Sequence, residues 1–407
     1  MKKLVQTWTG ISLVQRIVAG LVIGALLGMF VPSEGGIAIL GDVFVGALKA
    51  IAPLLVFFLV ISSLCYAGAS HGGVIRTVII MYMFSTFLAA IVAVTASSAF
   101  PVTLTLSEAA ADMAAPQGVA EVLRTLLMNV VTNPVQSLVS ANYIGILVWA
   151  VLIGIALRKA SDTTKQSLND ISAALSKTVT WIIQCAPFGI MGLVYNTVSV
   201  NGLSTFTEYG KLLAVLLGSM LFIYFVTNPI LVFWCIRKNP YPLIFKCLKK
   251  SAITAFFTRS SAANIPINME ACAEMGLDKD TYSVTIPLGA TINMDGAAIT
   301  ITVMTLAAAH TLGIMVDIPS AIILSVLATL SACGASGVAG GSLLLIPMAC
   351  SLFGISNDIA MQIVGIGFII GVIQDSVETA LNSSSDLLLS ASAEFRQWRL
   401  EGKDIKF

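Results

Sequence analysis

Apolar stretches longer than about 18 residues recur along the whole chain, and each is long enough to cross a bilayer as a helix. Only 11% of the 407 residues are charged, whereas a soluble protein carries about 25%. So few charged residues cannot cover the surface of a soluble protein of 407 residues, so we predict an all-α integral membrane protein. Uninterrupted spans are predicted over residues 13–31, 38–66, 74–100, 141–158, 170–196 and 209–236.

Lysine and arginine lie in every second predicted loop, and loops rich in these residues stay on the cytoplasmic side. Arg76 follows the second span, Lys165 the fourth and Lys249 the sixth. Both termini are therefore predicted to be cytoplasmic, which requires an even number of crossings. The longest less apolar stretch, residues 101–140, is acidic and is predicted as a surface loop with some helix.

Several other classes of protein are disfavoured. A net charge of +1 gives no reason to expect nucleic-acid binding. The seven cysteines and two histidines show no metal-binding spacing, and we read the cysteines as reduced packing residues. The first residues lack a short apolar core that ends in a small-residue cleavage site, so a cleaved signal peptide is not expected.

Two apolar segments near the carboxyl end are interrupted in the middle, residues 243–276 by Thr258–Asn264 and residues 318–353 by the glycine-rich Gly334–Gly341. Each half has about 12–16 residues, too few to cross a bilayer at 1.5 Å per residue. We predict two re-entrant hairpins that enter from opposite sides. A long span with a polar interior follows each of them, over residues 281–313 and 359–392. The total is eight spans, and such inverted repeats are typical of secondary transporters.

The two long spans carry an unusual set of polar residues. Asp375, Thr379, Asn382 and Asp386 are spaced 4, 3 and 4 residues apart, which places them on one helix face, with Glu378 at its border. A carboxylate at the bilayer centre costs at least about 2.5–3.5 kcal/mol, so a cation or an aqueous cavity is expected nearby.

The other long span contains Pro287–Gly296, where proline and glycine free backbone carbonyls close to Asp295. Such oxygens suit a small hard cation, but the residues alone do not separate Na⁺ from H⁺. Simpler interpretations remain open. Asp375 or Asp386 would then lie in a wet interfacial loop, Ser383–Ser385 would bond to backbone carbonyls, and Gly334–Gly341 would be a flexible loop.

At these motifs the chain resembles the sodium:dicarboxylate symporter family. The matching segments are Thr258-Arg259-Ser260-Ser261, Pro287–Gly296 with its Asn-Met-Asp-Gly core, and Asp375 to Asp386. The resemblance implies a homotrimer of eight transmembrane helices plus two opposed re-entrant hairpins, with a scaffold and an elevator-type transport domain. The implied parts are scaffold helices in 1–73, a transport helix in 74–100, an external loop and scaffold helices in 101–206, the transport core in 207–395 and a cytoplasmic tail in 396–407.

The resemblance also implies roles for individual residues. It assigns the Na⁺ ligands to three sites, made of Gly289, Asn293, Asn382 and Asp386; of Tyr82, Ser85, Thr86, Asn293 and Asp295; and of Thr291 and Ala332. Asp375 would bind the ammonium group of an amino-acid substrate. Its α-carboxylate would lie against Ser260, Ser261 and Asn382, with Thr379 nearby, and Gly334–Gly341, which includes Gly337, would form an external gate.

Two departures from the family pattern bear on the substrate. Carriers of acidic amino acids have an arginine three residues after the equivalent of Asp375, and here this residue is Glu378. The threonine that usually follows Asn-Met-Asp-Gly is Ala297. Glu378 would repel a substrate carboxylate by several kcal/mol but could accept a hydrogen bond from a hydroxyl.

Within the family, this pattern is most similar to the bacterial sodium:serine/threonine symporters. We therefore predict Na⁺-coupled import of L-serine and L-threonine by alternating access across a bacterial inner membrane, with Na⁺ as the coupling ion and no cofactor. The alternatives are a H⁺-coupled carrier in which Glu378 titrates, and a carrier of other small neutral amino acids or dicarboxylates. An aspartyl protease using Asp295 and Asp375 lacks the expected Gly-x-Gly-Asp context, and a channel or receptor would not accumulate substrate.

Overall fold

The computed structural model describes residues 11–31, 35–66, 73–106, 127–128, 131–333, 335 and 340–405. Within these ranges the regular structure is helical, and it contains no strand. Six helices there are long and apolar enough to cross a membrane, or seven if one bent pair counts as a single span. The predicted class, a helical protein with several membrane spans, is confirmed. The loop predicted over 101–140 lies largely outside the described residues.

The first two spans are α2 (Leu13–Phe30) and α3 (Gly35–Tyr66). A glycine face on α2 lets its backbone approach α9 (Ala186–Asn201) unusually closely. A Cβ added at Gly20 would lie 2.1 Å from the carbonyl oxygen of Pro187, and one at Gly24 would lie 2.4 Å from that of Met191. Close packing through small residues four apart is a common way for helices to associate in a bilayer.

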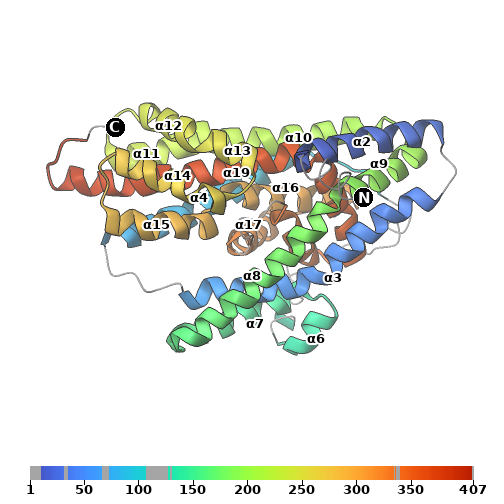
Figure 1. Ribbon diagram of the computed structural model, residues 1–407, viewed down its shortest axis with the longest axis horizontal. Coiled ribbons are helices and arrows are strands. Elements are labelled where there is room, and N and C mark those ends of the chain that lie inside the picture. Colours follow the sequence, from blue (N-terminus) through green and yellow to red (C-terminus); the bar gives the residue numbers. More distant parts are fainter. Residues whose placement is uncertain are drawn as a thin grey trace.

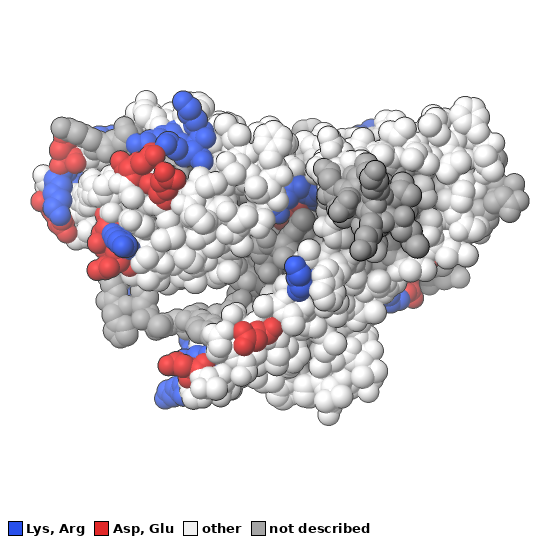
Figure 2. Space-filling model, in the orientation of Figure 1, with Lys and Arg blue, Asp and Glu red and all other residues white. Residues whose placement is uncertain are grey.

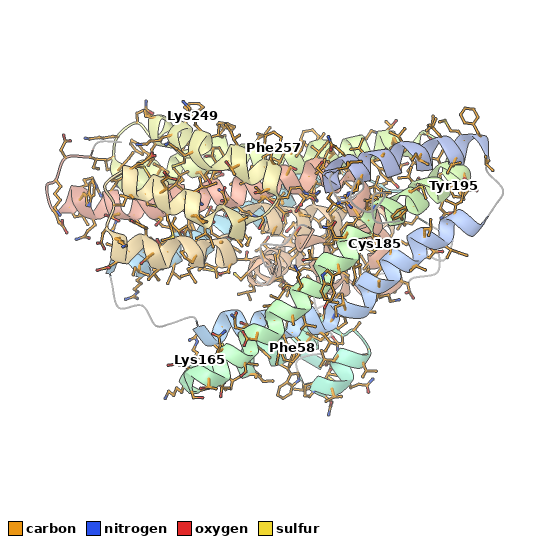
Figure 3. The ribbon with its side chains drawn as sticks, in the orientation of Figure 1. Phe58, Lys165, Cys185, Tyr195, Lys249 and Phe257 are labelled. Carbon is orange, nitrogen blue, oxygen red and sulfur yellow. The ribbon has the colours of Figure 1, made fainter. Side chains whose placement is uncertain are left out.

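The predicted span over 170–196 is not one straight helix. It is divided into α8 (Asp162–Gln184) and α9, which meet at an angle of 55° at Cys185. Pro187 lies in the first turn of α9 and cannot donate a backbone hydrogen bond, so the chain restarts there as a new helix. Figure 3 shows α8 running from near Lys165 to Cys185, and α9 continuing past Tyr195.

The fourth predicted span is also shorter than expected. Its helix α7 (Tyr143–Ala156) has 14 residues and is extended by the 3-10 turn Leu157–Lys159. At 1.5 Å per residue α7 is about 21 Å long, below the hydrocarbon thickness of about 30 Å. The short helix α6 (Pro134–Val139) precedes it.

The remaining predicted spans are present with changed ends. Residues 73–99 form α4 (Gly73–Ala99), and residues 205–236 form α10 (Thr205–Phe222), a π-helical turn (Ile223–Thr227) and α11 (Asn228–Ile236). The predicted span over 281–313 is broken into α15 (Lys279–Ile292) and α16 (Asp295–Thr311). The last span is much longer than predicted, because α19 (Asn357–Leu400) has 44 residues.

Both interrupted segments are helical on either side of a break. The first contains α12 (Tyr241–Cys247), a π-helical turn (Leu248–Ala252), α13 (Ile253–Thr258) and α14 (Ser261–Glu274). The second contains α17 (Ile318–Ala332), the 3-10 helix η5 (Ser342–Leu345) and α18 (Ile346–Ser351). The first break is at Arg259, which has a φ of 53° and ends α13. We call these segments the first hairpin and the second hairpin.

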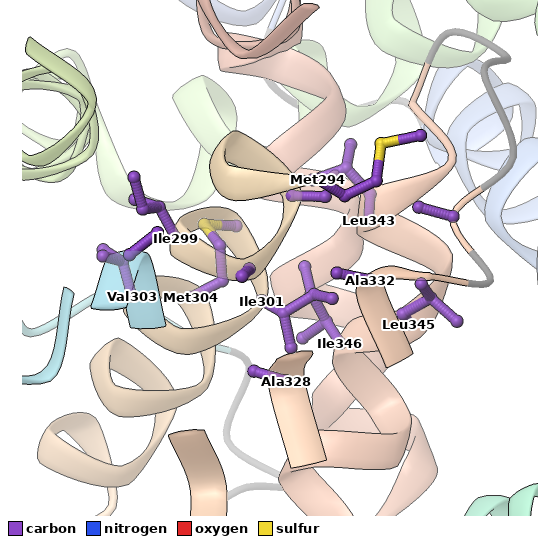
Figure 4. Close-up of a cluster of buried hydrophobic side chains, with 14 of the residues drawn as sticks. Met294, Ile299, Ile301, Val303, Met304, Ala328, Ala332, Leu343, Leu345 and Ile346 are labelled. Atoms are coloured by element: carbon purple, nitrogen blue, oxygen red, sulfur yellow. The ribbon is translucent and has the colours of Figure 1, made fainter. Parts of the chain in front are cut away.

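The helices form two packed groups (Figure 1). In one group α3 packs against α7, α8 and α9, and α2 packs along α9. In the other group α16 packs against α4, α10, α17, α18 and α19. Every residue of α16 from Asp295 to Ala309 is buried. Figure 4 shows apolar side chains of α16, among them Ile301 and Met304, close to Ala328 of α17 and Ile346 of α18.

Charged side chains are concentrated toward one end of the molecule in the face that Figure 2 shows. In Figure 2 basic and acidic residues cluster at the end where α12 begins and the carboxyl terminus lies, whereas the long flank is almost free of charge. Lys249 and Lys165, which come from two different predicted cytoplasmic loops, both lie toward that end (Figure 3). An uncharged belt with charges beyond it is what a bilayer-spanning protein requires.

Candidate functional site

The candidate site lies where α15 ends and α16 begins, beside α4 and α19. Asn293 and Met294 leave the helical conformation there, and Asp295 starts α16 with a side chain that is fully buried. The amino end of a helix carries a partial positive charge, which stabilises a carboxylate at this place. The sequence pattern Pro287–Gly296 indicated this break.

Asp295 is bound by hydroxyl groups of α4. Ser85 Oγ donates to Asp295 Oδ2 at 2.8 Å, and Thr86 Oγ1 donates to Asp295 Oδ1 at 3.2 Å. Ser85 and Thr86 therefore meet Asp295 as predicted, although 209 residues separate Thr86 from Asp295. No described basic side chain forms an ion pair with Asp295. A cation near these oxygens would offset the cost of a buried charge.

Asp386 is the second buried carboxylate. It lies against Asn293 and Gly289, which were predicted for the same Na⁺ site, and against Tyr82, which was predicted to join Asp295 instead. Asn293 Nδ2 donates to Asp386 Oδ1 at 2.8 Å, and Tyr82 OH lies 2.9 Å from the backbone oxygen of Asp386. Gly289 is so close that a Cβ there would lie 2.8 Å from Asp386 Oδ1. Two buried oxygens, Asn293 Oδ1 and Asp386 Oδ2, have no hydrogen-bond partner among the described residues. Unpartnered oxygens of this kind fit a hard cation such as Na⁺.

The other predicted Na⁺ ligands are less well assembled. Thr291 Oγ1 donates to the carbonyl oxygen of Leu288 in its own helix, at 2.7 Å. Ala332 is buried at the end of α17, and the next residue, Cys333, places its Sγ 3.7 Å from the carbonyl oxygen of Ile292. The ends of α15 and α17 are thus neighbours. The hydroxyl group of Thr291 is bonded to its own helix.

Asp375 has a partner that the sequence reasoning missed. Arg259 Nε of the first hairpin donates to Asp375 Oδ2 at 2.6 Å, and both side chains are at least nine-tenths buried. The backbone N–H of Gly340, in the second hairpin, donates to Asp375 Oδ1 at 3.1 Å. Both hairpins therefore reach the same carboxylate. The sequence offered one indication of this contact, which is that Arg259 lies inside the polar interruption of an apolar segment.

Glu378 lies one turn further along α19 in different surroundings. Its Oε2 accepts hydrogen bonds from Thr300 Oγ1 at 2.7 Å, Ser342 Oγ at 2.9 Å and Gln374 Nε2 at 2.5 Å. These donors are neutral, and no ion pair among the described residues involves Glu378. The sequence reasoning gave none of the three donors a role. Serine and threonine in a helix often bond to the backbone of the preceding turn, so their presence alone did not indicate a contact with Glu378.

The remaining predicted substrate residues lie close by. Asn382 Oδ1 accepts from the backbone N–H of Gly296 at 2.7 Å, and Thr379 Oγ1 donates to the backbone oxygen of Asp375 at 2.8 Å. Ser260 caps α14 by accepting from Ala263 N, and the neighbouring Ser261 is buried at the start of that helix. The predicted gate residue Gly337 lies outside the described residues.

Two of the simpler interpretations can now be judged. A wet loop for Asp375 and Asp386 is wrong, because these side chains are 3% and 1% exposed inside α19. Backbone bonding of the serine run is correct for Ser384 and Ser385, which donate to carbonyl oxygens of the preceding turn. Ser383 differs, because it accepts hydrogen bonds from the amides of the first hairpin.

Comparison with known proteins agrees with this geometry. Residues 13–394 match the family model described as the sodium:dicarboxylate symporter family. The chain is 56% identical over 399 residues to the serine/threonine transporter SstT of Bifidobacterium adolescentis, which covers 98% of this chain and 93% of that protein. It is also 56% identical over 400 residues to SstT of Streptococcus thermophilus, covering 98% of this chain and 100% of the relative.

A third relative, the serine/threonine transporter SstT of Streptococcus agalactiae, is 56% identical over 395 residues, or 97% of this chain and 98% of that protein. The match is nearly full-length in each case, so it includes both hairpins and both long spans. A transporter is thereby confirmed as the class of protein, and the protease alternative is set aside. The resemblance seen at the motifs extends over nearly the whole chain, which belongs to the sodium:dicarboxylate symporter family.

Proposed function

We propose that the protein is a Na⁺-coupled symporter that imports L-serine and L-threonine by alternating access. The observation that carries this proposal is the contrast between two buried carboxylates on α19. Asp375 is paired with Arg259, whereas Glu378 faces only neutral donors among the described residues. A site with Glu378 in this place repels an acidic substrate side chain and can accept a hydrogen bond from a hydroxyl group. The names of the relatives support the same substrates.

Na⁺ coupling is supported by the two buried acidic sites. Asp386 with Asn293, Gly289 and Asn382 is proposed as one Na⁺ site, and Asp295 with the α4 residues Tyr82, Ser85 and Thr86 as another. Their donors are neutral, and Asn293 Oδ1 and Asp386 Oδ2 have no partner among the described residues. Thr291 and Ala332 are proposed as a third site, supported only by the neighbouring ends of α15 and α17.

The amino-acid substrate is proposed to bind between the hairpins. Asp375 would bind its ammonium group in place of Arg259, and Asn382 with Ser260 and Ser261 would bind its α-carboxylate near Thr379. The two hairpins reach different oxygens of Asp375 through Arg259 and Gly340, which supports a binding place between them.

The larger architecture is proposed as follows. Eight transmembrane helices and two opposed re-entrant hairpins form a scaffold (1–73 and 101–206) and an elevator-type transport domain (74–100 and 207–395), with a tail in 396–407. The packing of α2, α3, α7, α8 and α9 against one another supports the division. We further propose a homotrimer in a bacterial inner membrane with both termini cytoplasmic, supported by the charged end shared by Lys165 and Lys249.

Transport by the purified protein in liposomes tests the proposal. Labelled L-serine should accumulate above equilibrium when an inward Na⁺ gradient is applied, and replacement of Na⁺ by choline should reduce uptake by more than tenfold. An Asp386→Asn variant should show the same loss, because the buried carboxylate is the proposed ligand of the coupling ion. Uptake that persists in choline would reject Na⁺ coupling, and a final ratio of one would indicate a channel.

A H⁺-coupled carrier is the second candidate, because Glu378 is a buried carboxylate without a basic partner among the described residues. Serine uptake measured against pH at constant Na⁺ distinguishes the two. Uptake driven by a proton gradient alone would favour H⁺ coupling, and no uptake without Na⁺ would favour the first proposal.

A further inference from the structure

The three hydrogen bonds to Glu378 all end on the same oxygen. Thr300, Ser342 and Gln374 donate to Oε2, and no described group donates to Oε1. Gln374 also donates to Thr300 Oγ1 at 2.7 Å, so the hydroxyl and the amide hold each other in place. The carboxylate is therefore fixed in orientation with one oxygen saturated and one oxygen available. An ionised carboxylate has two acceptor oxygens, and these three donors use only one of them.

The three donors come from three separate elements. Thr300 belongs to α16, Ser342 to η5 in the second hairpin, and Gln374 to α19. Gly296 packs against the same side chain, because a Cβ there would lie 2.8 Å from Glu378 Cγ. The side chain of Glu378 is thus packed directly against the backbone of α16.

A second unpartnered acceptor lies on a member of this cluster. Gln374 is 1% exposed, and its Oε1 has no hydrogen-bond partner among the described residues. The cluster therefore offers acceptors at Glu378 Oε1 and Gln374 Oε1 but no free donor. Its ligand must supply a donor, as a hydroxyl group does. An alanine side chain would leave the acceptors unpaired, which is costly in a buried site.

We propose that Thr300, Ser342 and Gln374 determine specificity by positioning Glu378, so that Oε1 receives the side-chain hydroxyl of the substrate. The inference rests on the proposed function and deepens it. The three residues do not touch the substrate in this account. They act through Glu378, and Ser342 makes recognition of the hydroxyl depend on the position of the second hairpin.

The test compares substrates that differ only in the hydroxyl. Inhibition of labelled serine uptake is measured with L-serine and L-alanine, and with L-threonine and L-2-aminobutyrate, in full-length protein in liposomes. In Thr300→Val and Ser342→Ala, the inhibition constants of serine and threonine should rise about tenfold, the effect of one lost charge-assisted hydrogen bond. The inhibition constants of alanine and 2-aminobutyrate should change less than twofold. Thr300→Ser, which keeps the hydroxyl group, should discriminate between serine and alanine as the wild-type protein does.

Thr302→Val is the matched control. Thr302 is buried on the same helix, and its hydroxyl has no partner among the described residues. The inference is overturned if Thr300→Val and Thr302→Val lose discrimination between serine and alanine equally. It is also overturned if Thr300→Val and Ser342→Ala discriminate as well as the wild-type protein does. In either case Na⁺-dependent serine uptake would still support the proposed function.

If the wild-type protein shows no uptake, the proposed function fails, and binding decides the inference separately. Serine should then raise the thermal midpoint of wild-type protein more than alanine does, and Thr300→Val should remove the difference. Equal shifts with serine and alanine in the wild-type protein overturn it.

Discussion

The two hairpins are attached to α19 in different ways. Besides the Arg259–Asp375 ion pair at its tip, the first hairpin is held by a buried network of neutral groups. In that network Asn264 Nδ2 donates to Ser383 Oγ at 2.8 Å and Asn268 Nδ2 donates to the backbone oxygen of Ser383 at 2.9 Å. The second hairpin reaches α19 through Ser342 and Gly340, which bind the carboxylates Glu378 and Asp375.

The neutral network of the first hairpin is therefore a structural attachment, whereas the second hairpin is attached through residues of the proposed substrate site. The neutral network of the first hairpin ends on Ser383, which is not a proposed ligand, so its hydrogen bonds can persist when substrate binds. The polar attachments of the second hairpin are to the carboxylates that are proposed to receive the substrate. Its position should therefore respond to substrate, whereas most of the first hairpin should not.

The largest expected effect comes from Asp375→Asn, because this carboxylate joins both hairpins. Arg259 would be left buried without its partner, which typically costs about 3–5 kcal/mol. We expect a large fall in the thermal midpoint of the purified protein and loss of serine uptake. The double variant Arg259→Gln/Asp375→Asn should recover much of the stability but not the uptake. Recovery of uptake as well would show that Asp375 does not bind the ammonium group.

A smaller effect is expected from Asn268→Ala, which breaks the network of the first hairpin alone. Loss of a buried hydrogen-bonding group costs about 1–3 kcal/mol, so the thermal midpoint should fall. The discrimination between serine and alanine should remain, since Asn268 contacts neither Glu378 nor its donors. Glu270→Ala, at an exposed position of the same helix, is the control. Equal midpoints in the two variants would mean that the network contributes nothing.

The smallest effect concerns the start of the second hairpin. Asp317 caps α17, and hydrogen bonds from Ser320 lower the pKa of its carboxyl group. A lowered pKa stabilises the folded state above about pH 4, and this contribution is lost as the pH falls through the folded-state pKa. Hydrogen exchange in the first turn of α17 should be slower in the wild-type protein than in Asp317→Ala at pH 6, and the difference should shrink at pH 3.

Asp317→Asn isolates the charge in that experiment, because asparagine caps a helix without ionising. Asp317→Asn should slow hydrogen exchange in the first turn of α17 less than aspartate does at pH 6. Its effect on exchange should not decline toward pH 3. A difference between Asp317→Ala and the wild-type protein that is constant from pH 6 to pH 3 would contradict the role of the ionised carboxyl group.

Much of the fold was predictable from local pattern. Long apolar runs located the helices, and the polar interruption at Thr258–Asn264 located the first hairpin break. The break before Asp295 followed from proline, glycine and asparagine inside a span. The bend at Cys185 was missed because the apolar pattern continues through it, and the close contact of α2 with α9 was missed because glycines four apart are common in membrane helices.

The site was predictable in part, and the limit was distance along the chain. Helix periodicity placed Asp375, Thr379, Asn382 and Asp386 on one face, but it could not show that Arg259, which lies 116 residues from Asp375, pairs with it. Helix periodicity also could not show that the hydroxyl group of Thr300 donates to another helix, because threonines in membrane helices commonly donate to the backbone of their own helix. These pairings are set by tertiary packing, which a local pattern does not contain.

The complete burial of α16 has a consequence for how this protein can change. Most bilayer spans have one side that meets lipid, where almost any apolar residue is acceptable. From Asp295 to Ala309 no such side exists. Tolerance to substitution along α16 should therefore have no helical period, and the helix should be as constrained as the centre of a soluble core. Variation among related carriers is then expected on the outward faces of helices such as α2 and α4, which contact the lipid.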